Sequence, residues 1–145
     1  MKIAILEDDK TQLQMVEQAL LGGDNDWGEP VDCRTFTSGL ALLQSLKSEV
    51  YDCLILDRRV PDMSGDVILQ WVRQYGEKKN ASYTTVIMLT SLRGEDEMLG
   101  GLASGADDYI VKPFRPRELV ARVKRLLDAK KITTDLAKAN MAGSA

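Results

Sequence analysis

Five side chains that could bind a metal ion or transfer a group follow the ends of four short apolar runs. They are Glu7 and Asp8 after residues 3–6, Asp57 after 53–56, Thr90 after 85–89 and Lys112 after 109–111. If these runs are parallel strands of one sheet, their carboxyl ends meet at the edge where open α/β sheets bind ligands. Any one of these residues alone is better explained as a turn former or a helix cap. Five suitable residue types at four strand ends are hard to attribute to chance, so we expect a functional site there.

The chemistry expected of this set is phosphoryl transfer assisted by a metal ion. Two carboxylates about 4 Å apart repel each other by roughly 4 kcal/mol at an effective dielectric of ~20, so positive charge must lie beside them. Lys112 supplies one charge, and a divalent cation would supply two more. All-oxygen ligands favour Mg2+ or Mn2+ over zinc. Beside such a cation and an ammonium group, Asp57 is an oxygen nucleophile suited to phosphorus, and Thr90 can donate its hydroxyl to a phosphate oxygen.

The elements that must position these residues alternate regularly along the chain. Strands are expected at about 3–6, 31–36, 53–56, 85–89 and 109–111, and helices at about 10–21, 38–46, 66–75, 95–104 and 115–128. The run 53–56 is apolar throughout, which suits a strand that is covered on both faces. Five βα units in a row predict an α/β fold with helices on both faces of a parallel sheet, in the flavodoxin-like strand order 2-1-3-4-5.

Composition excludes several classes of function. The 145 residues suit one domain, and 19 basic against 22 acidic residues give a net charge of −3, so we expect any contact with DNA to be made by another domain. The chain has no histidine, which rules out histidine-based acid–base catalysis. Cys33 and Cys53 are expected to be free, buried thiols in a reducing cytoplasm. The apolar runs are too short for a signal peptide or a membrane span, so we expect a cytoplasmic location without membrane contact.

The chain has two parts that differ in sequence pattern. Residues 1–129 carry all five βα units and are expected to form one domain. Residues 130–145 are polar and rich in small side chains, so we expect a linker or an extension of the last helix, leading to an output domain.

The motifs at the strand ends resemble the receiver domains of bacterial two-component response regulators, over residues 1 to about 128. The matching stretches are Ile5-Leu6-Glu7-Asp8-Asp9, Leu54-Ile55-Leu56-Asp57, Val60-Pro61-Asp62-Met63-Ser64-Gly65, Val86-Ile87-Met88-Leu89-Thr90-Ser91 and Tyr109-Ile110-Val111-Lys112-Pro113-Phe114. Each motif is modest alone, but the ordered set is specific. The resemblance implies a CheY-like switch that takes a phosphoryl group from a sensor histidine kinase. It would be a stoichiometric acceptor that catalyses its own phosphorylation and dephosphorylation, and not an enzyme with turnover.

The resemblance also implies which residues hold the metal. Asp57 is the expected phosphoacceptor and, with Asp8, an expected carboxylate ligand of Mg2+. The backbone carbonyl of Arg59 is the expected third ligand. Glu7 is expected to reach the metal through water, and Asp9 to begin a helix outside the coordination shell.

For the remaining site residues, the resemblance implies contact with phosphate and a conformational response. Lys112 is expected to contact the phosphoryl oxygens, and the peptide bond before Pro113 to be cis. Thr90 and Tyr109 are the expected switch pair. Once phosphate forms, the threonine would move toward it and the aromatic ring would turn inward.

The stretch from Gly105 to Lys124 resembles receivers that precede a winged-helix DNA-binding domain, the OmpR/PhoB type. Those receivers form homodimers through helix 4, strand 5 and helix 5, using ion pairs between subunits. The candidate interface residues are Asp108, Arg122, Glu118 and Lys124. Met98 and Ala103 replace charged partners that are common for Glu118 and Lys124, so we expect a weaker or differently paired dimer. Without the resemblance, the basic residues of the last helix would be read as a solvated face.

Bulky residues around the acceptor are a second departure from the family pattern. Arg58 and Arg59 follow Asp57, where small or amide residues are frequent, and Leu92 lies two residues after Thr90. We expect this bulk to hinder the water that attacks an acyl phosphate, which would give a long-lived phosphorylated state.

Other functions fit these residues less well or remain as alternatives. A magnesium-dependent phosphatase with an aspartate nucleophile uses similar residues, but its nucleophile follows the first strand in an Asp-x-Asp pattern. A flavin carrier on the same fold needs a phosphate loop after the first strand, where three acids stand here. A receiver that works alone through protein–protein contacts is a further alternative. A receiver-like module that no longer takes phosphate fits poorly with the intact set of acids, threonine and lysine.

Overall fold

The computed structural model describes residues 1–76, 83–91 and 105–143, and its centre is one five-stranded parallel sheet. The strands are β1 (Lys2–Leu6), β2 (Asp32–Phe36), β3 (Cys53–Asp57), β4 (Thr85–Thr90) and β5 (Asp108–Val111). Their order is β2-β1-β3-β4-β5, which confirms the expected α/β topology. The helix expected at 95–104 lies outside the described residues.

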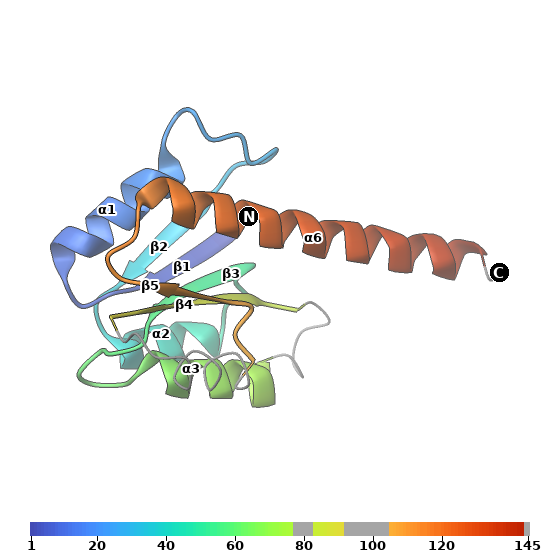
Figure 1. Ribbon diagram of the computed structural model, residues 1–145. Helices are drawn as coiled ribbons and strands as arrows, with labels where there is room; N and C mark the ends of the chain where they lie inside the picture. The colour runs from blue at the N-terminus through green and yellow to red at the C-terminus, as the bar shows by residue number, and fades with distance from the viewer. Residues whose placement is uncertain (77–82, 92–104, 144–145) are drawn as a thin grey trace.

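Helices cover both faces of the sheet (Figure 1). α1 (Lys10–Leu21) and α6 (Pro116–Gly143) lie on one face, and α2 (Gly39–Leu46) and α3 (Gly65–Trp71) lie on the other. α3 continues into a π-helical turn, η1 (Val72–Gly76). Alternate residues of each central strand therefore enter two separate cores. In β3, Ile55 packs with the α1 and α6 side, whereas Leu54 and Leu56 pack with the α2 and α3 side.

Polar side chains define where the first helix begins and ends. The carboxylate of Asp9 accepts hydrogen bonds from the backbone N–H groups of Thr11 at 2.9 Å and Gln12 at 3.1 Å, so Asp9 is the N-cap of α1, as expected. The helix ends at Leu21, just before the Gly-Gly pair. Beyond that end, the indole N–H of Trp27 donates to the carbonyl of Leu20 at 3.0 Å.

Asp62, in the loop between β3 and α3, caps the start of α2 from a distance in sequence. Its carboxylate accepts hydrogen bonds from the Ser38 hydroxyl at 2.6 Å and from the N–H groups of Gly39 at 3.0 Å and Leu40 at 3.1 Å. These donors stabilise the charged form and lower the pKa of Asp62 to about 2. The loop that carries Asp62 is thereby joined to the neighbouring helix.

Replacing Asp62 with alanine is expected to destabilise the fold in a pH-dependent way. An aspartate pKa that is depressed in the folded state stabilises the protein above the ordinary value near 3.9, and this contribution is lost as the pH falls toward about 2. The difference in free energy of unfolding between the two proteins should be largest and constant above about pH 5, and it should become smaller as the pH is lowered. Urea titrations at several pH values measure it. The exposed Asp24 provides the matched control, and an equal difference at every pH would contradict the expectation.

The last helix is much longer than the sequence analysis predicts. We expected it to end at residue 128, but α6 continues to Gly143 and extends past the sheet (Figure 1). In the described part of residues 130–145, the chain is helical and continues α6, and whether this segment links to an output domain stays a prediction. Residues 129–140 contain no glycine or proline, and the hydroxyls of Thr133 and Thr134 donate to the carbonyls of Ala129 and Lys130, each at 3.0 Å. Local propensity thus carries the helix beyond its packed part, where the side chains are exposed.

Two expectations about the chain as a whole can be compared with the described residues. Cys33 is half-buried and Cys53 is fully buried, and both thiols are free. Burial raises the pKa of Cys33 to about 12, so this thiol is a poor nucleophile at neutral pH. No helix in the described part of the chain combines the length and the apolar character that crossing a membrane requires.

Candidate functional site

The sheet register brings the predicted site residues to one edge. β1 pairs with β3 so that Leu6 lies opposite Leu56, and the residues that follow them therefore leave the sheet side by side. β4 pairs with β3 on its other side, and β5 pairs with β4 so that Val111 lies opposite Thr90. Lys112 follows directly and donates its backbone N–H to the Thr90 carbonyl at 2.6 Å. Four strand ends thus converge, as expected from the sequence.

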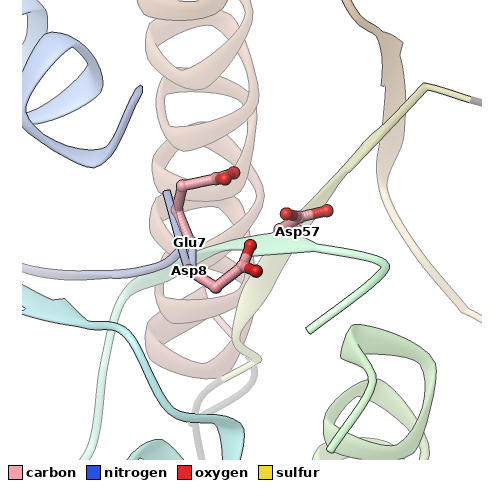
Figure 2. Close-up of side chains that lie close together, drawn as sticks. All are labelled: Glu7, Asp8 and Asp57. Carbon is pink, nitrogen blue, oxygen red and sulfur yellow. The ribbon is translucent and has the colours of Figure 1, made fainter. Parts of the chain in front are cut away.

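The three acids form one cluster at the ends of β1 and β3. Ligand oxygens from Glu7, Asp8 and Asp57 all lie within 4.8 Å of one another. Figure 2 shows Glu7 and Asp8 at the end of one strand, close to Asp57 at the end of its neighbour. Glu7 and Asp57 are buried, whereas Asp8 is exposed. The cluster is therefore open to solvent on the Asp8 side.

Lys112 neutralises part of this charge. Its ammonium group contacts Glu7 Oε2 at 2.8 Å and Asp57 Oδ2 at 3.4 Å. Burial raises the pKa of Glu7, although the hydrogen bond from Lys112 opposes that rise. For Lys112 itself, burial disfavours the charge, but the hydrogen bond to Glu7 and the charge of Asp57 prevail and raise its pKa. The lysine is thus held as an ammonium beside the Asp57 carboxylate.

The donor set fits a hard divalent cation. With every group ionised, three carboxylates face one ammonium, so the cluster has two uncompensated negative charges. Glu7 Oε2 is bound to Lys112 and Glu7 Oε1 accepts from the Asp9 N–H at 3.3 Å. The Asp8 carboxylate, by contrast, has no hydrogen-bond partner among the described residues. Asp8 is therefore better placed than Glu7 to bind a metal ion directly.

The remaining site residues surround this cluster. The backbone N–H of Arg59 donates to Asp57 Oδ1 at 3.1 Å, which joins the following loop to the Asp57 side chain. Thr90 is the buried last residue of β4, and the peptide bond between Lys112 and Pro113 is cis, as expected. Tyr109 is buried in β5 with 3% of its surface exposed, so its ring lies inward.

The four candidate interface residues do not form one cluster. Arg122 contacts Asp108 at 3.1 Å and Glu118 at 2.8 Å, both within the same chain. Lys124 lies elsewhere, with its ammonium 5.7 Å from the centre of the Trp27 ring. An ion pair between subunits would therefore have to replace the ion pairs that Arg122 makes within its own chain, or form in addition to them. Lys124 already lies against Trp27 and is less available for a contact between subunits. Met98 and Ala103 lie outside the described residues.

Arg58 has a role that the sequence analysis missed. We expected its bulk to hinder water at the acceptor, but its guanidinium contacts Asp66 Oδ2 at 2.8 Å and the Tyr109 hydroxyl at 2.8 Å. Arg59 is exposed, and Leu92 lies outside the described residues. A long-lived phosphorylated state remains a prediction. No local signal identifies the Arg58 contacts, because Tyr109 is 51 residues away.

Comparisons with known proteins agree with this geometry. The chain is 35% identical over 127 residues to the regulatory protein VanRc of Enterococcus gallinarum, which covers 87% of this chain and 49% of that protein. It is 44% identical over 84 residues to the transcriptional regulatory protein SrrA of Staphylococcus aureus, covering 58% of this chain and 32% of that one. The chain thus spans about half or less of the length of these relatives.

A solved structure and a protein family give the same result. The structure of the response regulator DrrB, a Thermotoga maritima OmpR/PhoB homologue, superposes with a TM-score of 0.73 at 35% identity, covering 89% of this chain and 53% of that one. Residues 3–124 match the response regulator receiver domain family. With its strand order, its converging acids and its half-buried lysine, the chain belongs to the response regulator receiver domain family.

Proposed function

We propose that Asp57 accepts a phosphoryl group from a sensor histidine kinase, with Mg2+ bound by Asp8, Asp57 and the backbone carbonyl of Arg59. Mn2+ is the alternative ion, because it accepts the same oxygen ligands. The observation that carries this proposal is the meeting of three carboxylates and Lys112 at one sheet edge, in a chain that belongs to the receiver family. Because of that family membership, we also propose that the protein acts in the cytoplasm.

Three residues have different roles in the proposed phosphoryl transfer. An Asp57 carboxylate oxygen forms the new bond to phosphorus as the bond from phosphorus to the donor nitrogen breaks, and the bonding electrons leave with the donor imidazole. Lys112, held beside Asp57, faces the negative charge of the phosphoryl oxygens. Thr90, at the end of β4, is the residue proposed to donate its hydroxyl to one of them. The cation, when bound, neutralises charge on acceptor and phosphoryl group alike.

The proposed outcome is a switch and not repeated turnover, because the phosphoryl group stays on the protein. Phosphorylation would shift a pre-existing equilibrium of the β5 and α6 face, together with the expected fourth helix, toward a homodimer. Relatives that are named as transcriptional regulators support an output domain that binds DNA. A receiver that acts alone through protein contacts is the alternative, and the sequence beyond residue 145 discriminates between them. A phosphatase would instead turn over a phosphomonoester.

Labelling by acetyl phosphate is expected to require Mg2+. Replacing Asp8 with asparagine is expected to raise the Mg2+ concentration that labelling needs. The substitution removes a charged ligand on the exposed side of the cluster, so Mg2+ affinity should fall by at least about tenfold, the scale of effects seen when metal sites lose supporting groups. Isothermal titration with Mg2+ measures the affinity, and acid-gel autoradiography measures the label with Mg2+ or with EDTA.

Asp9→Asn is the matched control for that experiment. It changes the neighbouring carboxylate in the same way, but Asn is as good an N-cap as Asp, so α1 should keep its start. Magnesium binding should then be unchanged. Equal Mg2+ affinity in Asp8→Asn and the unmodified chain, or labelling that is indifferent to EDTA, would contradict the proposed metal site.

A further inference from the structure

Arg58 connects three parts of the fold around the acceptor. Its backbone N–H donates to the Leu89 carbonyl of β4 at 2.9 Å, and its own carbonyl accepts from the Gly65 N–H at 3.1 Å. Its guanidinium reaches Asp66, in the first turn of α3, and the hydroxyl of Tyr109 in β5. The side chain is 23% exposed, so these contacts are partly shielded from water.

The contact between Arg58 and Tyr109 stabilises one position of the ring. Tyr109 is buried within the core that lies on the α2 and α3 side of the sheet. A phenol that turns into a protein interior must exchange its hydrogen bonds to water for a partner inside. Nη1 of Arg58 donates to the phenol oxygen at 2.8 Å with the ring in this inward position. Losing this donor therefore disfavours the inward position.

Asp66 fixes the guanidinium in the orientation that this contact requires. Nε of Arg58 donates to Asp66 Oδ2, which leaves Nη1 directed to the phenol. An arginine side chain has many rotamers, and pairing with a carboxylate on a helix removes much of that freedom. Because Arg58 directly follows Asp57 in the chain, the same residue that is joined to the acceptor also sets the position of the β5 aromatic ring.

We infer that Arg58 is a positioning residue that holds Tyr109 in its inward position, with Asp66 orienting the guanidinium. The link from ring position to phosphate rests on the proposed function. The contact itself does not, because it depends only on residues of the folded chain. In this chain, ring position is thus set by two inputs: the phosphoryl group on Asp57 and the fixed hydrogen bond from Arg58.

Fluorine NMR of the full chain labelled with 3-fluorotyrosine tests the inference without phosphate. The chain has four tyrosines, and Tyr109→Phe assigns the resonance of Tyr109. In Arg58→Met, the population with the ring inward should fall by about tenfold relative to the outward one, the change expected when a charged donor is lost. The resonance should move toward its solvent-exposed position. Arg58→Lys keeps the charge and should keep part of the inward population of the Tyr109 ring. Asp66→Asn should move the resonance in the same direction as Arg58→Met.

Arg125→Met is the matched control, because it removes an exposed arginine of α6, and the resonance should then stay in place. Circular dichroism verifies that each variant is folded. A Tyr109 resonance that is unchanged in folded Arg58→Met and in Asp66→Asn would overturn the inference.

A second readout separates this inference from the proposed function. Arg58→Met should need a higher concentration of beryllofluoride with Mg2+ than the unmodified chain, and saturating beryllofluoride should return its Tyr109 resonance toward the inward position. If the resonance moves but the chain takes neither label nor beryllofluoride, the proposed function fails and the positioning role stands. If the chain is labelled normally but the resonance does not move, the inference about Arg58 fails.

Discussion

Replacing Asp57 with asparagine is expected to abolish labelling of the chain by acetyl phosphate. An amide oxygen is a much weaker nucleophile than a carboxylate, and the substitution also removes one proposed metal ligand. The shape of the side chain is kept, and an amide oxygen can still accept the Arg59 N–H that now donates to Oδ1 at 3.1 Å. Because Asp57 lies beside Glu7 and Asp8, removing its charge also relieves repulsion. The variant should therefore remain folded while its labelling falls to background.

Asp24→Asn is the control for this change, since it removes an exposed carboxylate remote from the strand ends and should label normally. Urea unfolding shows that both proteins are folded, and the free energy of unfolding of Asp57→Asn should equal or exceed that of the unmodified chain. Persistent labelling of Asp57→Asn would mean that another residue accepts the phosphoryl group. Reduction of the acyl phosphate with borohydride, followed by peptide mass spectrometry, then locates the modified residue.

Replacing Gly65 with alanine is expected to lower the free energy of unfolding and also to slow the labelling of Asp57. A Cβ atom at this position would lie 2.6 Å from the backbone carbonyl oxygen of Asp57 and 3.1 Å from Cε of Met88. The methionine end can move, but the carbonyl belongs to the last residue of a central strand. Overpacking of this kind costs typically about 1–3 kcal/mol. Either α3 or the acceptor must shift, so labelling should also slow.

Gly23→Ala is the matched control, because a Cβ there meets nothing within 4 Å. Its free energy of unfolding should change little, since alanine in a compatible loop also reduces the freedom of the unfolded chain. Urea unfolding and labelling rates measure both variants. Unchanged stability and labelling in Gly65→Ala would show that the close approach of α3 to Asp57 is not required. Gly39 allows a parallel test, since a Cβ there would meet the Met63 carbonyl oxygen.

The ion pairs of Arg122 determine how a dimer could form. Within one chain this residue is already shared between Asp108 and Glu118. These pairs lie at the surface and are partly exposed, and surface ion pairs contribute little, typically about 0–1 kcal/mol. Exchanging them between subunits would therefore have a small net effect on the free energy of association. Apolar contact would then have to supply most of the affinity, in keeping with the weaker dimer that Met98 and Ala103 suggest in the sequence.

The fold and most of the site could be predicted from the sequence because their signals are local. Runs such as 53–56 identify buried strands, and the helical spacing between them requires crossovers that make the strands parallel. Once the strands are parallel, the residues after their ends must meet. The convergence of Glu7, Asp8, Asp57 and Lys112 follows from topology, with no detail of side-chain packing.

The tertiary structure alone decided where the long polar side chains go. Arg58 follows the acceptor in sequence but binds Tyr109, and Asp62 lies in one loop but caps the helix after another strand. Long side chains have many rotamers, and partners distant in sequence select among them only after the backbone is folded. Apolar periodicity determines which surfaces are buried, whereas these hydrogen bonds depend on which groups the folded backbone brings within reach.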